Sequence, residues 1–217
     1  MKTNKSANKI FALSETFESI IGESSFSGFP ALFIRFAGCN LRCAWCDTTY
    51  AYEVSYFLSH EELFDKIKGS KQKFVLFTGG EPLLQSSLNK LIEDIIINLN
   101  KKVILETNGS FTIKDVHQQA HIVLDCKLPS SLEQKKCLTS NYNFIKKTDD
   151  IMFVIKDEED YEYSKKKIYK YNLEKRTNII FQPAYESLDI KQLSNWIIED
   201  ALKVRLGIQL HKYIGVK

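Results

Sequence analysis

The chain has 217 residues, of which 44% are hydrophobic and 26% are charged. This composition excludes a wholly disordered chain, and the length allows one domain, or one domain with a small appendage. The 30 basic and 27 acidic residues give a formal net charge of +3. That balance is not typical of a protein that binds along nucleic-acid backbones, so we expect no nucleic-acid partner.

Three of the five cysteines, Cys39, Cys43 and Cys46, lie within eight residues, and Cys126 and Cys137 are isolated. The polar start of the chain is not followed by an apolar signal region, and no run of about 18 uncharged apolar residues is present. We therefore expect no membrane contact and a cytoplasmic location. In that reducing compartment clustered cysteines are more often metal ligands or catalysts than disulfides.

In chain order, residues 1–9 form a polar tail, and one domain is expected over residues 10–217. Short apolar runs then alternate with segments of helical periodicity. Strands are predicted at 31–37, 74–77, 103–105, 122–124, 151–155, 178–181 and 204–210. Helices are predicted at 60–68, after a capping box formed by Ser59 and Glu62, and at 88–99, 113–118, 158–171 and 190–201.

Strands that alternate with helices predict parallel βα units, and wholly apolar strands are typical of a sheet covered on both faces. About 200 residues are too few for eight such units. The sequence therefore predicts an α/β fold, a partial (βα) barrel of about six to seven parallel strands or an open sheet. Polar segments follow most of the strands, and we expect them to meet at one rim and form a pocket. They are 38–39, 78–82, 106–109, 125–127, 182–183 and 211–212.

The three clustered cysteines have the spacing C-x3-C-x2-C. Three thiolates on one loop could hold a four-iron cluster with one iron left open for chemistry. Structural zinc is an alternative if Cys126 or a single His supplies the fourth ligand. A redox pair of Cys43 and Cys46 is another alternative, although it gives Cys39 no role.

The cysteine motif, with the aromatic Trp45 before its last cysteine, resembles that of the radical S-adenosylmethionine (SAM) superfamily. The segment Thr78-Gly-Gly-Glu-Pro82 resembles the GGEP motif of the same superfamily. The resemblance implies a radical SAM type of barrel and a 4Fe–4S cluster held by Cys39, Cys43 and Cys46, with SAM on the open iron. It also implies cleavage of SAM to a 5′-deoxyadenosyl radical, driven by an unidentified flavodoxin- or ferredoxin-like electron donor.

From Ala12 to Lys217 the chain is similar to the 7-carboxy-7-deazaguanine synthase family. The segments that carry this resemblance are 15–23, 46–48, 127–131 and 209–215. Four positions depart from the family pattern. Ile21 replaces Gln, Ser24 replaces Gly, and Asp125-Cys126 replaces Ser-Pro.

The resemblance implies conversion of 6-carboxy-5,6,7,8-tetrahydropterin to 7-carboxy-7-deazaguanine, with hydrogen abstraction, ring contraction and loss of ammonia. This lyase reaction belongs to the biosynthesis of queuosine and related 7-deazapurines. Another small radical SAM enzyme, such as a glycyl-radical-enzyme activase, is an alternative because it shares the cysteine spacing and comparable length. A non-enzymatic metal-binding module is a further alternative.

The family resemblance also implies roles for individual residues. Thr48 would bind Mg²⁺ beside the substrate. SAM would contact Trp45, Cys46, Asp47, Gly80, Asp125, Cys126, Lys127 and Gln182. The pterin would contact Ile20, Ile21, Gly22, Arg35, Thr78 and the terminal carboxylate of Lys217.

The chemistry of these residues supports part of this assignment. Arg35 offers a bidentate fork for a carboxylated pterin, although a structural ion pair is an alternative role. A Thr48 hydroxyl suits Mg²⁺, although Thr48 could be a turn residue and Asp47 is a competing oxygen donor. The sequence indicates no role for Arg42, Cys137 or His211. The open edges of a partial barrel lead us to expect a homodimer.

Overall fold

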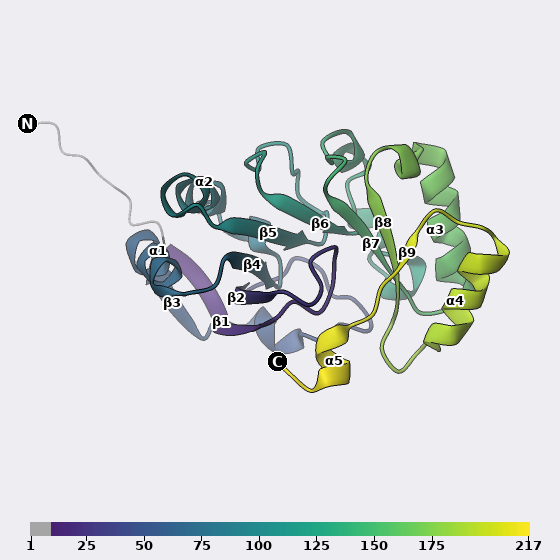
Figure 1. Ribbon diagram of the computed structural model, residues 1–217, viewed down its shortest axis with the longest axis horizontal. Coiled ribbons are helices and arrows are strands. Elements are labelled where there is room, and N and C mark those ends of the chain that lie inside the picture. Colours follow the sequence, from purple (N-terminus) through teal and green to yellow (C-terminus); the bar gives the residue numbers. More distant parts are fainter. Residues whose placement is uncertain (1–9) are drawn as a thin grey trace, which may run out of the picture.

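The computed structural model describes residues 10–217, so the predicted tail 1–9 lies outside the described residues. One nine-stranded sheet with the order β3-β1-β2-β4-β5-β6-β7-β8-β9 runs through it (Figure 1). Its strands are β1 (Ile10–Ile20), β2 (Pro30–Phe36), β3 (Tyr56–Ser59), β4 (Phe74–Gly79), β5 (Lys102–Thr107), β6 (His121–Asp125), β7 (Asp150–Ile155), β8 (Asn178–Pro183) and β9 (Arg205–Leu206).

The sheet is parallel except at one edge. Every neighbouring pair from β2 to β9 is parallel, which makes seven parallel strands. At the remaining edge β1 is antiparallel to both β2 and β3. The predicted α/β fold with six to seven parallel strands is therefore confirmed. The carboxyl ends of the parallel strands share one rim, as the prediction of a common pocket requires.

Five helices accompany the sheet: α1 (His60–Gly69), α2 (Leu88–Leu99), α3 (Glu158–Tyr171), α4 (Ile190–Glu199) and α5 (Leu210–Ile214). Figure 1 shows α1 and α2 beside one end of the sheet and α3 and α4 beside the other. The predicted capping box begins α1, since Ser59 Oγ accepts from the Glu62 amide and the Glu62 carboxylate accepts from the Ser59 amide. None of the helices within residues 10–217 has both the length and the apolar character needed to cross a membrane.

The parallel strands have apolar side chains on both faces, which explains their nearly continuous apolar runs. Ile34 and Phe77 belong to the larger core, which also contains the buried residues of the helices. The alternate residues Phe33 and Leu76 belong to a second, smaller core on the other face.

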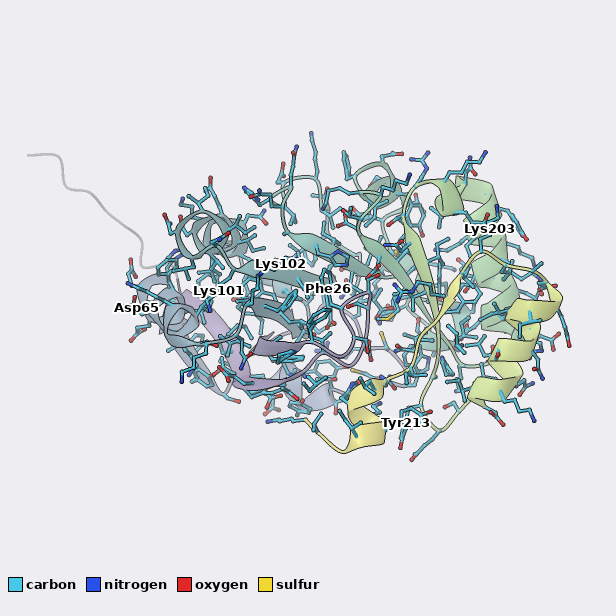
Figure 2. The ribbon with its side chains drawn as sticks, in the orientation of Figure 1. Phe26, Asp65, Lys101, Lys102, Lys203 and Tyr213 are labelled. Atoms are coloured by element: carbon cyan, nitrogen blue, oxygen red, sulfur yellow. The ribbon has the colours of Figure 1, made fainter. Side chains whose placement is uncertain are left out.

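The loop at 21–29, between β1 and β2, packs against the smaller core. The Phe26 ring contacts the rings of Phe74 and His121, with centroids 5.3 and 4.7 Å away. Figure 2 shows Phe26 near the middle of the sheet. Ser25 fixes the loop further, because its amide and hydroxyl both donate to the buried Asp150 carboxylate at 2.8 and 2.6 Å. The loop that carries the predicted pterin residues is thus anchored to β7.

The predicted helix at 113–118 is wrong, because this segment consists of turns. Ile113 and Val116 are buried as predicted, but the side chain of Asn141 satisfies the main chain of the loop in place of helical hydrogen bonds. Its Oδ1 accepts from the Ile113 amide at 3.1 Å, and its Nδ2 donates to the carbonyls of Gly109 and Phe111. A contact distant in sequence therefore overrides the local pattern.

The predicted strand at 204–210 is reduced to β9, and Leu210 begins α5 instead. Gly207 ends the strand in close contact with β8: an added Cβ would lie 2.7 Å from Ile180 Cγ2. The chain then turns back toward β1, where the Leu210 amide donates to the Gly22 carbonyl at 2.9 Å. This turn brings the C-terminal segment to the rim of the sheet.

Candidate active site

A cavity of about 460 Å³ opens at the carboxyl ends of the parallel strands. Its walls come from the loops after β2, β4, β5, β6 and β8, together with α5 and Lys217. The predicted site residues in these walls are Ile20, Gly22, Arg35, Cys39, Cys43, Trp45, Cys46, Asp47, Thr48, Thr78, Gly80, Asp125, Lys127, Gln182 and Lys217. Residues spread over almost the whole chain therefore meet in one place.

Two of the predicted site residues, Ile21 and Cys126, do not line the cavity. Both are 0% exposed, and Ile21 lies in the smaller apolar core. The Ile21 amide and carbonyl are already paired with Phe29 and Gly28. An isoleucine suits this apolar environment, which accounts for the departure from the usual Gln at this position. The roles that the sequence indicates for these two side chains stay predictions.

The cysteine loop follows β2 and is held in place by the segment around residues 130–133. The Arg42 amide donates to Glu133 Oε1 at 2.6 Å, and the Ala44 amide donates to the Ser131 carbonyl at 3.1 Å. The Arg42 guanidinium folds back on the loop, with Nη1 donating to the carbonyls of Cys39 and Leu41, both at 2.7 Å. Arg42, which had no role in the sequence, therefore shapes the loop.

The three cysteines of the loop fit a cluster better than a single ion. They are free and half-buried, and all three line the cavity. Within residues 10–217, no three His, Cys, Asp or Glu side chains surround one ion position, and Cys126, the possible fourth zinc ligand, is outside the cavity. A four-iron cluster is wider than an ion and needs only these thiolates from the chain. Burial raises the pKa of Cys43 to about 11, so binding must displace its proton.

The segment 78–82 has the backbone geometry that only glycine permits. An added Cβ on Gly80 would lie 1.9 Å from the Gly38 carbonyl oxygen, so the β4 loop could not approach the β2 loop with any other residue. A hydrogen bond stabilises this close approach: the Glu81 amide donates to the Gly38 carbonyl at 2.9 Å. Gly80 thus places the main chain of the β4 loop directly beside the cysteine loop.

Glu81 connects the β4 loop to the β5 loop. Its side chain is 0% exposed and accepts hydrogen bonds from the Leu83 amide at 3.0 Å, the Thr107 hydroxyl at 2.7 Å and the Asn108 amide at 2.8 Å. Asn108 Nδ2 in turn donates to Cys39 Sγ at 3.8 Å. Hydrogen bonds to the ligand sulfurs influence the reduction potential of an iron–sulfur cluster. Glu81, acting through Asn108, is therefore connected to the predicted cluster.

One wall of the cavity presents polar groups that lack partners. Asp125 Oδ1 and both amide atoms of Gln182 are buried without a hydrogen bond to any residue in 10–217. Lys127 Nζ binds the other Asp125 oxygen at 2.5 Å and lies 5.6 Å from the Trp45 ring centroid. Unpaired buried polar atoms are costly, so this wall requires a polar ligand. SAM, with its ammonium, carboxylate and ribose hydroxyls, fits that requirement.

The opposite wall is built around Glu15. Its carboxylate accepts from Arg35 Nε at 2.8 Å and from the Tyr50 hydroxyl at 3.0 Å, and it pairs with the Lys217 ammonium. Burial would raise the pKa of Glu15, but these three partners lower it overall. Within the described residues the two terminal nitrogens of Arg35 have no partner. The ion pair considered from the sequence therefore exists, and it leaves part of the Arg35 fork free for an anion.

Among the cavity residues that were not assigned roles from the sequence are Glu23, Glu106, Gln209 and His211. Gln209 Nε2 donates to Glu23 Oε1 at 2.8 Å. His211 packs so closely on Gly22 that an added Cβ would lie 1.9 Å from its Nδ1. Glu106 and His211 belong to polar segments that were expected at the rim, so that signal could have identified both.

Glu106 is half-buried and lies near a second acid, Glu23. Burial and the nearby Glu23 raise the pKa of Glu106 to about 7, although a hydrogen bond with Thr78 and the charge of Arg35 lower it. An unfolded Glu titrates near 4.5. The stabilising effect of the neutral form is therefore complete below pH 4.5 and is lost as the pH rises to about 7.

The Glu106→Gln variant is expected to remove the fall in stability that ionisation of Glu106 causes between pH 4.5 and about 7. In the ligand-free protein it should be more stable than the wild type above pH 7, by about 1–3 kcal/mol, and equally stable near pH 4.5. Urea unfolding at both pH values measures the difference. A constant difference between the two proteins across this pH range would show that Glu106 does not titrate within it.

Thr48 and Asp47 supply oxygen atoms at the mouth of the cavity. Thr48 Oγ1 donates to Asp47 Oδ1 at 2.8 Å, and Lys212 Nζ donates to Asp47 Oδ2 at 2.8 Å. Lys212 already neutralises the Asp47 carboxylate. The Thr48 oxygen, which uses only its hydrogen in the bond to Asp47, is therefore the more available ligand for a metal ion. Mg²⁺ keeps several waters and needs few protein ligands when a substrate carboxylate also binds it, so these residues fit a magnesium site.

Comparison with known proteins agrees with this geometry. Residues 33–122 match the radical SAM superfamily. The chain is 35% identical over 216 residues to the 7-carboxy-7-deazaguanine synthase of Koribacter versatilis, across 93% of this chain and 96% of that protein. It is 38% identical over 207 residues to the protein of the same name from Clostridium acetobutylicum, across 92% of this chain and 94% of that one.

Two solved structures share the fold. The crystal structure of QueE from Escherichia coli superposes with a TM-score of 0.77 at 23% sequence identity, and the match covers 93% of this chain and 95% of that one. The structure of TYW1 with a lysine-pyruvate adduct bound has a TM-score of 0.54 at 17% identity, and covers 78% of this chain and 73% of that one. At these identities the likeness concerns the fold alone. The sequence similarity to the named synthases, over nearly the full length, shows that the chain belongs to the 7-carboxy-7-deazaguanine synthase family of the radical SAM superfamily.

Proposed function

We propose that this chain converts 6-carboxy-5,6,7,8-tetrahydropterin to 7-carboxy-7-deazaguanine, as a lyase in the biosynthesis of queuosine and related 7-deazapurines. The observation that carries the proposal is the single cavity in which three free cysteines and an anion-binding wall face the same space. The relatives that match over most of the chain carry the synthase name, and this favours the synthase over a glycyl-radical-enzyme activase.

The cofactors are a 4Fe–4S cluster, SAM and Mg²⁺. Cys39, Cys43 and Cys46 would hold the cluster, and the wall formed by Asp125, Lys127 and Gln182 would bind SAM, with Trp45, Cys46, Asp47, Gly80 and the main chain of Cys126 beside it. When bound and reduced, the cluster and SAM supply the radical that removes a hydrogen atom from the substrate. The chain provides binding, orientation and shielding from water.

On the substrate side, the free part of the Arg35 fork would bind the pterin carboxylate, with Thr78, Ile20, Gly22 and the terminal carboxylate of Lys217 completing the pocket. Ser19 Oγ donates to the main-chain oxygen of Lys217 at 2.6 Å, and this bond holds the last residue against β1. Glu106, with a pKa of about 7, can accept or hold a proton near neutral pH. The ring contraction and the loss of ammonia both require proton transfers, for which this carboxyl group is placed.

Thr48→Ala is expected to weaken the stimulation of turnover by Mg²⁺, because it removes the hydroxyl that would bind the ion. The concentration of Mg²⁺ needed for half-maximal rate should rise about tenfold, with a smaller change in the rate at saturation. Thr49→Ala, at the exposed neighbouring position, is the matched control and should respond to Mg²⁺ as the wild type does. An unchanged Mg²⁺ response in Thr48→Ala would remove Thr48 from the metal site.

The remaining properties are also proposed. Residues 10–217 would act as one domain, in the cytoplasm, without nucleic-acid or membrane partners. A flavodoxin- or ferredoxin-like protein would deliver the electron. The homodimer expected from the open sheet edges is supported by the edge formed by β1 and β3, where Ile10 and Phe57 are 57% and 62% exposed.

A substrate comparison tests the proposed function. The cluster-loaded protein is given SAM, Mg²⁺ and a chemical reductant, and SAM cleavage is measured with 6-carboxy-5,6,7,8-tetrahydropterin or with tetrahydropterin that lacks the carboxylate. We expect the carboxylated compound alone to be consumed, and Arg35→Lys to raise its KM about tenfold, since Lys cannot form a bidentate pair. Cleavage of SAM with no consumption of either pterin would leave the superfamily assignment intact and refute the substrate.

A further inference from the structure

A buried group of four side chains lies behind the SAM wall, outside the cavity. It consists of Cys126 after β6, Cys137, Tyr142 and Lys167 on α3, all at most 8% exposed. Cys126 Sγ is at the centre of the group. It lies 3.9 Å from Cys137 Sγ, 3.1 Å from the Tyr142 hydroxyl and 3.5 Å from Lys167 Nζ.

Lys167 is the unusual member of this group. Among residues 10–217 no carboxylate pairs with its ammonium, although a buried charge is costly without a partner. Its Nζ donates to Cys126 Sγ and lies 5.3 Å from the Tyr163 ring centroid. The sulfur is therefore the available counter-ion. An ammonium has no acceptor capacity, so Cys126 accepts this bond, and the Tyr142 hydroxyl and Cys137 thiol can donate to the same sulfur.

We propose that Cys126 and Cys137 form a buried, oxidisable dithiol, in which Lys167 holds Cys126 as the reactive thiolate and Cys137 resolves its oxidation to a disulfide. The 3.9 Å between the two sulfurs must close to about 2.05 Å for the disulfide to form. Electrostatics supports the assignment of roles. Hydrogen bonds from Cys137 and Tyr142, with the charge of Lys167, lower the pKa of Cys126 to about 7 despite burial, whereas the pKa of Cys137 is raised.

The oxidant is a peroxide, which is small enough to enter a packed core. The Cys126 thiolate attacks one peroxide oxygen, the O–O bond breaks, and a sulfenic acid and hydroxide form. Cys137 then attacks the sulfenic sulfur, the S–O bond breaks, and water leaves with the thiol proton. The two sulfurs together lose two electrons, which the peroxide accepts.

The dithiol is connected to the SAM wall. Cys126 lies between the cavity residues Asp125 and Lys127. Its oxidation leaves Lys167 on α3 without a counter-ion, and the same helix positions Trp45. The Asp160 carboxylate, on α3, accepts a hydrogen bond from Ser130 Oγ at 2.5 Å. Ser130 Oγ in turn accepts a hydrogen bond from Trp45 Nε1 at 2.9 Å. We therefore expect the oxidation state of the dithiol to affect how the residues around SAM are positioned.

Peptide mapping by mass spectrometry tests the proposal directly. Anaerobic, cluster-loaded protein at pH 7 receives one equivalent of hydrogen peroxide and is then quenched with acid and an alkylating agent. We expect a Cys126–Cys137 disulfide, lighter than the two thiols by two hydrogen atoms. In Cys137→Ser the disulfide cannot form, and the sulfenic acid of Cys126 should accumulate and react with dimedone. Recovery of both cysteines as free thiols would overturn the proposal, and so would a Lys167–Cys126 crosslink through oxygen.

The rate of disulfide formation tests the role of Lys167. Without the ammonium the pKa of Cys126 should rise, because the hydrogen bonds from Cys137 and Tyr142 remain but the charge and hydrogen bond of Lys167 are lost, and the thiolate fraction at pH 7 should fall. The greater nucleophilicity of the more basic thiolate offsets only part of this fall, so Lys167→Met should slow disulfide formation measurably. Lys166→Met, exposed on the same helix, should react at the wild-type rate. Equal rates in the two lysine variants would refute the thiolate pair.

Discussion

Cys43→Ala is expected to abolish iron binding and activity together. Cys43 lies at the centre of the loop that the Arg42 amide and Glu133 hold in place, and only three cysteines face the cavity within the described residues. Two thiolates leave two irons of a four-iron cluster without protein ligands, and such a cluster is not retained. The iron content after anaerobic reconstitution, and the visible absorption of the cluster, should fall to the level of buffer controls.

The matched control for this variant is Cys137→Ala, which removes a buried cysteine outside the cavity. It should bind iron at the wild-type level, and any effect should be on stability. Retained turnover in Cys43→Ala would refute the ligand role of this cysteine. Equal loss of iron in both variants would indicate a general effect of unfolding instead.

Glu81→Ala is expected to have the largest effect on stability. The substitution leaves three donors without an acceptor: the buried Thr107 hydroxyl, the buried Asn108 amide and the partly buried Leu83 amide. Each unsatisfied buried group costs about 1–3 kcal/mol, so the free energy of unfolding should fall by at least about 3 kcal/mol. Urea unfolding of the cluster-free protein measures this change.

The same variant should also affect the cluster, since Glu81 positions Asn108, which donates to Cys39 Sγ. Glu199→Ala, at an exposed position at the end of α4, is the control and should change stability by less than about 0.5 kcal/mol. If Glu81→Ala were as stable as Glu199→Ala, the hydrogen bonds that connect the β4 and β5 loops would not contribute to stability.

The parallel part of the fold could be predicted from sequence because its signals are local. Apolar runs such as 74–77 and 151–155 report strands buried on both faces, and the Ser59–Glu62 capping box marks the start of α1. The rim segments that follow the strands then identify most of the cavity, since parallel strands end on the same side.

The edge strand β1 was not predicted, because it mixes buried and half-buried residues and includes polar ones such as Thr16 and Glu18. The hydrogen bonds that hold the loops of the site together could not be predicted from the sequence either. The pairs Arg42–Glu133 and Glu81–Asn108 join segments 91 and 27 residues apart, and nothing local indicates which residues will meet. The position of Cys126 could have been anticipated: side chains alternate across an extended chain, so with Asp125 and Lys127 in the cavity wall Cys126 faces the other side.

The protein is expected to make a deazapurine from the carboxylated pterin in this cavity. The most direct measurement is product analysis of one reaction that contains the cluster-loaded protein, SAM, Mg²⁺, a reductant and 6-carboxy-5,6,7,8-tetrahydropterin. We expect a product with the mass and chromatographic behaviour of authentic 7-carboxy-7-deazaguanine, with one equivalent of ammonium released for each product molecule. Consumption of the pterin with no ammonium released and no deazapurine formed would contradict this expectation.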